Sequence, residues 1–166
     1  MSLPQRRSRR GFLRLAATAA AFAPTAALAS FGPTPGQPTG PYYPRPPQLT
    51  LRPGALQDND LIVVPGVDHD AIGAPLLLSG RALGADGRPL AGATVEIWQA
   101  NDAGRYLSTR DRRRRRDLDP GFQYFGSCRV EEDGAYAFRT IVPPAYPSGV
   151  VPGWIRPPHI HARVHD

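Results

Sequence analysis

Two Asp-Gly pairs lie between short runs of apolar and β-branched residues, and this pattern restricts the chain to strands joined by turns. The first pair, Asp86-Gly87, separates the β-rich runs 76–83 and 93–99. The second pair, Asp133-Gly134, divides "FGSCRVEEDGAYAFRTIV", which alternates on both sides of it. Asp-Gly between alternating runs is a strong hairpin signal, and no stretch after the first thirty residues repeats with a helical period. We therefore predict an all-β fold, an antiparallel β-sandwich with long loops.

Residues 1–29 read as an export signal. Arginines come first, an alanine-rich apolar run follows, and Ala27-Leu28-Ala29 offers a small-x-small cleavage site before Ser30. The apolar run is too short and too weakly apolar to span a membrane, so we expect no stable membrane anchor. The segment "SRRGFL", with Arg9 and Arg10, resembles the twin-arginine signal, and an arginine-rich Sec signal is the alternative. Either signal predicts a periplasmic or secreted protein.

The signal also accounts for most of the net positive charge. The whole chain has 20 Lys+Arg and 14 Asp+Glu, and residues 1–29 hold five arginines and no acid. The remainder therefore has 15 basic and 14 acidic residues, so its charge does not indicate a nucleic-acid-binding protein. A second basic block contains the run Arg112–Arg116. This run could bind a polyanion, but we interpret it as a solvated loop.

Residues 30–75 are predicted to form an N-terminal arm ahead of the sandwich, which we place at 76–166. The arm begins with "FGPTPGQPTGPYYPRPPQLTLRPG", where proline and glycine are too dense for a helix or a central strand. We expect this segment to be disordered or to lie over a partner surface.

The single cysteine, Cys128, excludes an intrachain disulfide and a cysteine-rich zinc site. Since it lies in an alternating segment, we expect a buried small hydrophobe there.

The end of the chain, "WIRPPHIHARVHD", contains three of the four histidines. His159 and His161 lie two residues apart in a predicted strand, so their side chains point to one face with Cα atoms about 7 Å apart. Two imidazoles so placed can bind one metal ion. The pair alone is a weak signal, and a strand that merely contains histidines is the alternative. His165 lies about 13 Å from His161 along an extended strand, and we expect a surface residue outside any site.

Two tyrosines offer further donor atoms. Tyr146 lies between prolines in "IVPPAYPSG", on a rigid loop that follows a strand, and Tyr106 ends the turn "NDAGRY". Each could equally be a packing aromatic. If both meet the two histidines, the site contains two phenolates and two imidazoles. A free phenol has a pKa of about 10, so only a strong Lewis acid keeps two of them ionised at neutral pH, and ferric iron fits better than zinc or copper(I).

Four segments of the chain resemble the intradiol ring-cleavage dioxygenases, especially the protocatechuate 3,4-dioxygenase type. They are "GPYYPRPP", "GRPLAGATVEIWQANDAGRY", "EDGAYAFRTIVPPAYP" and "WIRPPHIH". The spacing also matches, because Tyr146 precedes His159 by thirteen residues and follows Tyr106 by forty. The N-terminal helical dimerisation region of catechol 1,2-dioxygenases is not seen, which favours the protocatechuate-like branch or its small exported relatives.

The resemblance implies a non-haem Fe(III) site, and four residues would supply its ligands: Tyr106, Tyr146, His159 and His161. It also implies two catalytic residues, since Tyr146 would leave the metal and take up a proton while Arg156 would stabilise negative charge on the substrate. Tyr42 or Tyr43 would line the substrate pocket. The substrate would be a catechol-type ring, which O2 cleaves between the two hydroxyl-bearing carbons to give a muconate-type product. An oligomer is left open.

The resemblance further implies a sandwich with a prealbumin/transthyretin-like core, which in relatives continues through several more strands after the histidine pair. Because the sequence stops at Asp166, we expect an incomplete sandwich with an open edge beside the site. Two other function classes are left open. A non-enzymatic transthyretin-like binding module would fit "DGRPLAGATVEIW" equally well, but it needs none of the four candidate ligands. A truncated relative could bind metal without turnover.

Overall fold

The computed structural model describes residues 32–45, 58–111, 117–148 and 151–165. The predicted signal peptide and the Arg112–Arg116 run lie outside these ranges. Seven strands form in the described part of the chain: β1 (Pro75–Arg81), β2 (Thr94–Trp98), β3 (Phe125–Arg129), β4 (Ala135–Ile141), β5 (Tyr146–Pro147), β6 (Ile155–Arg156) and β7 (His161–His165). No helix in the described ranges is long and apolar enough to cross a membrane.

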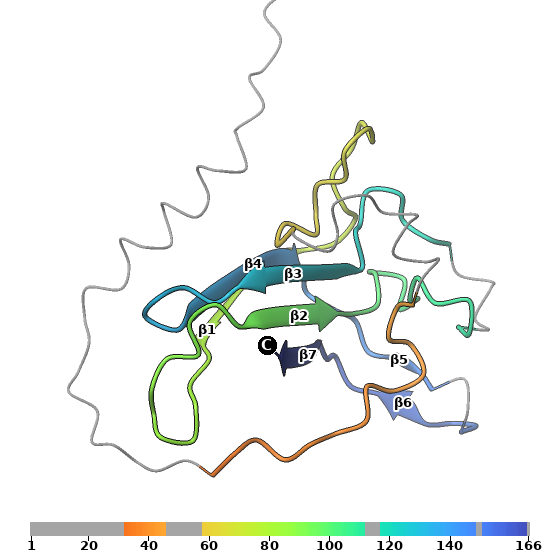
Figure 1. The fold of residues 1–166 in the computed structure, drawn as a ribbon. Coiled ribbons are helices and arrows are strands. Elements are labelled where there is room, and N and C mark those ends of the chain that lie inside the picture. The colour runs from red at the N-terminus through yellow and green to blue at the C-terminus, as the bar shows by residue number, and fades with distance from the viewer. Residues whose placement is uncertain (1–31, 46–57, 112–116, 149–150, 166) are drawn as a thin grey trace, which may run out of the picture.

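The strands form three small sheets in which every strand pair is antiparallel (Figure 1). One sheet contains β1 and β4, a second has the order β3-β2-β7, and a third contains β5 and β6. β1 and β2 correspond to the β-rich runs 76–83 and 93–99 of the sequence. The prediction of an all-β, antiparallel fold is therefore confirmed.

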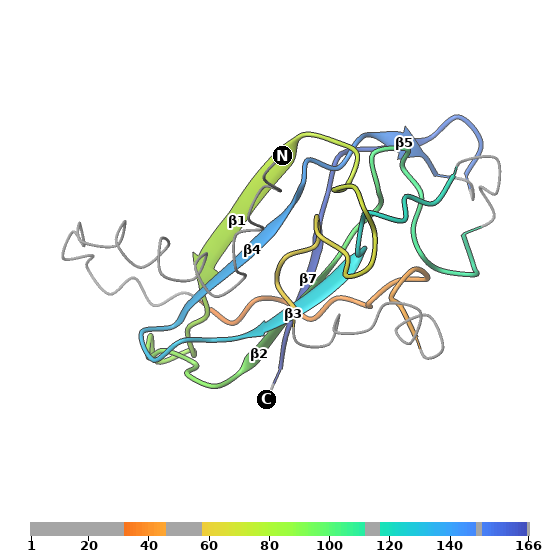
Figure 2. The same ribbon diagram turned by 90° about the horizontal axis from the view of Figure 1, so that it is seen from above.

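The turn at Asp133-Gly134 forms as predicted, but the two strands around it do not pair as a hairpin. Gly134 has φ +90°, and its N–H donates to the carbonyl oxygen of Glu131 at 2.9 Å. However, β3 pairs with β2, whereas β4 pairs with β1 (Figure 2). The end of β1 is hydrogen-bonded to this turn. Ala82 N–H donates to the Gly134 carbonyl at 2.9 Å, and Arg81 Nε donates to the Asp133 carbonyl at 2.9 Å. The chain thus passes from one sheet to the other at this turn.

Side chains from the first two sheets share one buried apolar cluster. Its members are Leu61, Ile62, Ala82, Ala93, Val95, Ile97, Phe122, Tyr124, Val130, Phe138 and Ile141. β2 contributes to this cluster through one face, while its other face carries Glu96 and Trp98. Burial of this apolar surface is the main driving force that holds the sheets together.

Residues 58–64, which the sequence placed in the N-terminal arm, pack into this same core. Leu61 is 0% exposed, and its N–H donates to the carbonyl oxygen of Arg139 in β4 at 2.8 Å. Gly126 in β3 permits this approach, since a Cβ there would lie 2.6 Å from the carbonyl oxygen of Asp58. The later part of the arm is therefore integral to the folded unit.

Candidate metal centre

Three donor atoms converge at one point beside the β5–β6 pair. The hydroxyl oxygens of Tyr106 and Tyr146 lie 3.0 Å apart. Nε2 of His159 lies 3.2 Å from the first oxygen and 3.1 Å from the second. Two ligands that bind one ion at about 2 Å are themselves about 3 Å apart, so this triangle has the spacing of a coordination shell. The structure thus brings together three residues from distant parts of the sequence.

Tyr106 is held in place by the loop that follows β2. Its side chain is 2% exposed, and its backbone N–H donates to Oδ2 of Asp111 at 2.8 Å. One residue earlier, Arg105 N–H donates to Oδ1 of Asn101 at 2.9 Å, which closes the turn. The ring of Tyr42 stacks on the Tyr106 ring with centroids 4.8 Å apart. The hydroxyl of Tyr106 is therefore aimed at the centre by a closed loop and a stacked ring.

Tyr146 and Arg156 face each other across the short β5–β6 ladder. They are paired in register, and Tyr146 is 1% exposed. The Arg156 guanidinium carbon lies 5.4 Å from the centroid of the Trp154 ring. Its Nε is buried and has no hydrogen-bond partner among the described residues. The arginine predicted as catalytic is therefore adjacent to a candidate ligand, with part of its hydrogen-bonding capacity unused.

His159 presents Nε2 to the two hydroxyl oxygens because its other nitrogen is already engaged. Nδ1 lies 2.6 Å from the carbonyl oxygen of Pro157. A carbonyl oxygen can only accept, so Nδ1 carries the hydrogen and the lone pair is on Nε2. A ligating histidine is typically oriented by this kind of contact. The proline pair after Arg156 thus orients the His159 imidazole, through the carbonyl oxygen of Pro157.

His161 lies beside this triangle, in a different setting from His159. β7 begins at His161, so the prediction that both histidines lie within one strand is wrong, although their ring centroids are only 5.0 Å apart. The centroid of the His161 ring lies 6.0 Å from that of Tyr106. Burial, with smaller effects of His159 and Arg156, lowers the pKa of His161 to about 4. Its imidazole is therefore neutral at physiological pH, which is the form that binds metals.

The two tyrosines of "GPYYP" diverge in the structure. Tyr42 is buried against Tyr106, next to the candidate centre. The hydroxyl of Tyr43 instead donates to Oε2 of Glu96 at 2.9 Å, and burial and Glu96 raise its pKa. The rings of Tyr43 and Trp98 form a T-shaped contact, with centroids 4.9 Å apart. The arm, orange in Figure 1, is therefore fixed at two neighbouring points.

Sequence reasoning missed Glu96 and Trp98 as neighbours of the site. Alternation along β2 already placed these two residues on one face, but the strand that pairs with β2 beside them was unknown.

His165 is outside the triangle, as predicted, yet it is not a free surface residue. It is half-buried, and its Nε2 lies 3.3 Å from Oε1 of Glu96. Asp111, at the start of the arginine block, is likewise buried rather than solvated.

The two phenol oxygens and two imidazoles suit a ferric ion better than they suit the common divalent ions. The described ranges contain no group of three or more His, Cys, Asp or Glu that could hold a metal ion, so a metal here requires the tyrosines. Phenolates are hard anionic donors, and imidazole suits iron as well as zinc and copper.

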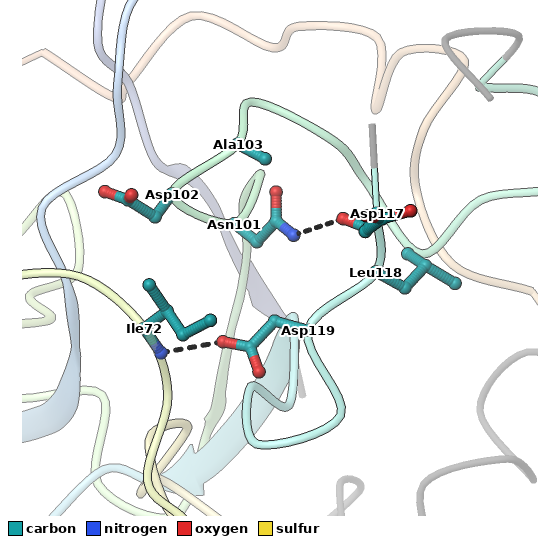
Figure 3. Close-up of a pocket in the computed structure, with 7 residues that line it drawn as sticks. All are labelled: Ile72, Asn101, Asp102, Ala103, Asp117, Leu118 and Asp119. Carbon is teal, nitrogen blue, oxygen red and sulfur yellow. Dashed lines mark hydrogen bonds between the residues drawn. The ribbon is translucent and has the colours of Figure 1, made fainter. Parts of the chain in front are cut away.

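A separate cavity of about 150 Å³ (Figure 3) is lined by Ile72, Asn101, Asp102, Ala103, Asp117, Leu118 and Asp119. It includes none of the four candidate ligands.

Comparison with known proteins shows the family. The family model described as "Dioxygenase" matches residues 39–165. The protocatechuate 3,4-dioxygenase beta chain of Burkholderia cepacia is 40% identical over 104 residues, which cover 63% of this chain and 44% of the relative. The chain belongs to the intradiol ring-cleavage dioxygenase family. Catechol 1,2-dioxygenase 2 of Acinetobacter lwoffii is 42% identical over 74 residues, which cover 45% of this chain and 25% of the relative.

Solved structures agree with this placement. The dioxygenase domain of a dioxygenase carbohydrate-binding protein fusion from Streptomyces sp. SirexAA-E is 30% identical, with a TM-score of 0.52 over 81% of this chain and 67% of that one. 3-Chlorocatechol 1,2-dioxygenase from Rhodococcus opacus 1CP is 26% identical, with a TM-score of 0.56 over 80% of this chain and 51% of that one. The chain spans less than half the length of the curated relatives it matches.

Proposed function

We propose that the chain binds Fe(III) and cleaves a catechol-type ring between its two hydroxyl-bearing carbons with O2, yielding a muconate-type product. The observation that carries this proposal is the triangle formed by the oxygens of Tyr106 and Tyr146 and Nε2 of His159. Family membership supports the reaction class, and the donor atoms support the metal. His161 is proposed as the fourth ligand, since its neutral ring lies next to His159.

The two tyrosines would have different roles. Tyr106 is tied by its backbone to Asp111 and covered by Tyr42, so its phenolate oxygen stays in place during turnover. Tyr146 is equally buried, and it lies on a ladder of only two residue pairs, directly opposite Arg156. We propose that the Tyr146 oxygen accepts the proton that a substrate hydroxyl loses on binding. Ferric iron, when bound, would supply the Lewis acidity that keeps the phenols ionised and activates the dianionic catechol.

Arg156 would stabilise the substrate as it becomes negatively charged. Its register position opposite Tyr146 places its backbone next to the proton acceptor. Its positive charge already contributes to the lowered pKa of His161, so the guanidinium acts electrostatically on the centre. A fixed cation near developing negative charge lowers the barrier, because no solvent has to reorganise. Tyr42, adjacent to Tyr106, is proposed to line the substrate side of the site.

Iron reconstitution of the purified protein tests the proposal. Phenolate-to-Fe(III) charge transfer should give a red to burgundy protein with one iron per chain. Oxygen uptake should then follow the addition of a catechol, and a panel of ring-substituted catechols with an assay for the intradiol product would identify the substrate class. A protein that stays colourless and iron-free would overturn the iron site. A coloured protein without oxygen uptake would leave the metal site standing and overturn the enzymatic part in favour of a metal-binding relative.

A further inference from the structure

The two candidate histidine ligands are oriented by different means. Nδ1 of His159 is fixed by the Pro157 carbonyl oxygen at 2.6 Å. No ring nitrogen of His161 has a hydrogen bond to any other part of the chain that the structure describes. Ligating histidines almost always donate their second N–H to an acceptor, which fixes the ring plane. Something else must therefore set the ring plane of His161.

The indole of Trp98 is the group in position to do so. Trp98 and His161 are directly opposite each other in the β2–β7 ladder. Their rings are stacked, with centroids 4.9 Å apart and planes inclined by only 1°. Offset or parallel stacking is a favourable contact for aromatic rings and constrains both planes at once. The imidazole is thus laid flat on the indole.

Hydrogen bonding does not fix the indole itself. Trp98 is 3% exposed, and its Nε1–H has no hydrogen-bond partner among the residues that the structure describes. A buried indole N–H usually finds a partner, so this one is unusual. The plane of Trp98 must therefore be determined by packing.

Tyr43, in the N-terminal arm, supplies this packing, and the Arg163 guanidinium of β7 lies 5.9 Å from the centroid of the Tyr43 ring. The rings of Tyr43 and Trp98 are perpendicular, at 90°, with centroids 4.9 Å apart. Tyr43 is in turn held by Glu96, which accepts its hydroxyl at 2.9 Å. The Glu96 carboxylate is itself largely buried, and Arg163 and His165 of β7 approach it to 3.9 Å and 3.3 Å. These partners offset the cost of burying the Glu96 carboxylate, so it can remain the acceptor of the Tyr43 hydroxyl.

From these contacts we propose that Trp98 is the positioning residue of His161, and that the Tyr43–Glu96 hydrogen bond holds Trp98 in that pose. The N-terminal arm thereby contributes to the metal centre without supplying a ligand. Since His161 is a ligand only if the proposed function holds, the inference rests on that function. Its first consequence nevertheless concerns the metal-free protein, in which the indole of Trp98 is the aromatic ring stacked on the His161 ring.

Proton NMR of the metal-free protein tests the stacking directly. A ring that lies flat on an indole has its carbon-bound protons shifted upfield by the indole ring current. The His161 signals, assigned by their loss in His161→Gln, should be upfield in the wild type. They should return toward ordinary positions in Trp98→Leu and stay upfield in Trp98→Phe, which keeps a flat face. Because Trp98 is buried, far-UV circular dichroism must first show that each variant is folded.

Tyr43→Phe provides a milder variant that removes one hydroxyl and no ring. It should reduce the upfield shift of the His161 protons, since Glu96 no longer holds the Tyr43 ring against Trp98. Tyr136→Phe is the matched control, because Tyr136 lies in β4 beside Phe138 and away from the centre. This control should leave the His161 signals unchanged. Unchanged signals in both Tyr43→Phe and Trp98→Leu would overturn the proposal.

Iron titration then connects positioning to the metal. Loss of a group that orients a ligating histidine weakens metal binding by about 10- to 100-fold. We expect a weakening of this size in Trp98→Leu, with a changed Fe(III) electron paramagnetic resonance signal, and rescue by Trp98→Phe. Wild-type affinity and an unchanged signal in Trp98→Leu would overturn the proposal while the proposed function stands. If the wild type takes up no iron, the proposed function fails, and the NMR result alone decides whether Trp98 orients His161.

Discussion

Oδ2 of Asp111 accepts a 2.8 Å hydrogen bond from the backbone N–H of Tyr106, five residues earlier in the chain. The Asp111 N–H donates to the carbonyl oxygen of Ser108 at 3.0 Å, so both ends of this loop are tied together. Asp111 is buried, and its removal would leave a buried N–H without this acceptor. The loop that aims the Tyr106 hydroxyl depends on this carboxylate.

We predict that Asp111→Ala weakens iron binding by about 10-fold, the lower end of what an outer-shell residue contributes. Asp111→Asn retains an acceptor oxygen and should remain closer to the wild type. Iron titration followed through the charge-transfer absorption measures both. The matched control is Asp86→Ala, which removes a similar contact, Oδ1 to the Arg88 N–H at 3.0 Å, in a remote exposed turn. Equal effects of Asp86→Ala and Asp111→Ala would contradict a specific role for Asp111.

The two tyrosines of the triangle should differ when their hydroxyls are removed. Tyr106→Phe deletes the phenolate that stays bound, so we expect loss of most of the charge-transfer absorption and of iron binding. Tyr146→Phe deletes the proposed proton acceptor, so we expect retained iron, a shifted absorption band and little oxygen uptake. Visible spectroscopy, iron analysis and an oxygen electrode measure these outcomes. Two variants with the same iron content and the same activity would contradict separate roles.

The triangle could be predicted because its chemistry lies in short motifs. Tyr146 on its proline-flanked loop and His159 after two prolines both lie within segments that resemble a known family. The register between β2 and β7 could not be predicted, since strand pairing depends on which faces are buried and not on either strand alone. For this reason Trp98 was noticed as part of a strand but not as the stacking partner of His161.

The Asp133-Gly134 turn likewise could be predicted from the sequence, whereas the pairing of the strands on either side of it could not. The dipeptide specifies a local reversal, and φ +90° at Gly134 forms as the turn requires. Whether the flanking strands then pair with each other is decided by competition with other edges. Here β1 pairs with β4 over seven residues, from Pro75 to Arg81. A long antiparallel ladder outweighs what two short hairpin arms could form, and the turn becomes a crossing between sheets.

Gly126 marks the closest approach between the segment at Asp58 and the core sheet. A Cβ there would meet the Asp58 carbonyl oxygen and Cδ1 of Leu61, each at 2.6 Å. We predict that Gly126→Ala lowers the free energy of unfolding by about 1–3 kcal/mol, as overpacking does. Gly36→Ala is the control, because nothing lies within 4 Å of a Cβ at that position. Urea denaturation compares the two, and equal midpoints would argue against the tight contact.

Cys128 should be an unreactive thiol in the folded protein. Burial raises its pKa from 9.0 to about 11. The thiolate is the reactive form, so at pH 8 we expect alkylation about 100-fold slower than in the unfolded chain. Because the folded state disfavours the thiolate, the free energy of unfolding should fall as pH rises from 9 toward 11, and it should not change below 9 for this reason. Iodoacetamide labelling with and without urea measures the rates, and Cys128→Ser should remove this part of the alkaline dependence.

We predict that the protein is exported through its first 29 residues and that the pair Arg9-Arg10 is the element that is recognised. A twin-arginine signal is read by a receptor, whereas a Sec signal depends mainly on positive charge ahead of an apolar run. Arg9→Lys combined with Arg10→Lys keeps the charge, so it should abolish export only if the receptor reads the arginines themselves. The control replaces Arg6 and Arg7 with lysine and should leave export intact. Cell fractionation measures both variants, and N-terminal sequencing should place the wild-type cleavage between Ala29 and Ser30. Full export of the Arg9/Arg10 double variant would instead indicate a Sec signal, which delivers the chain unfolded and would require iron to be acquired after export.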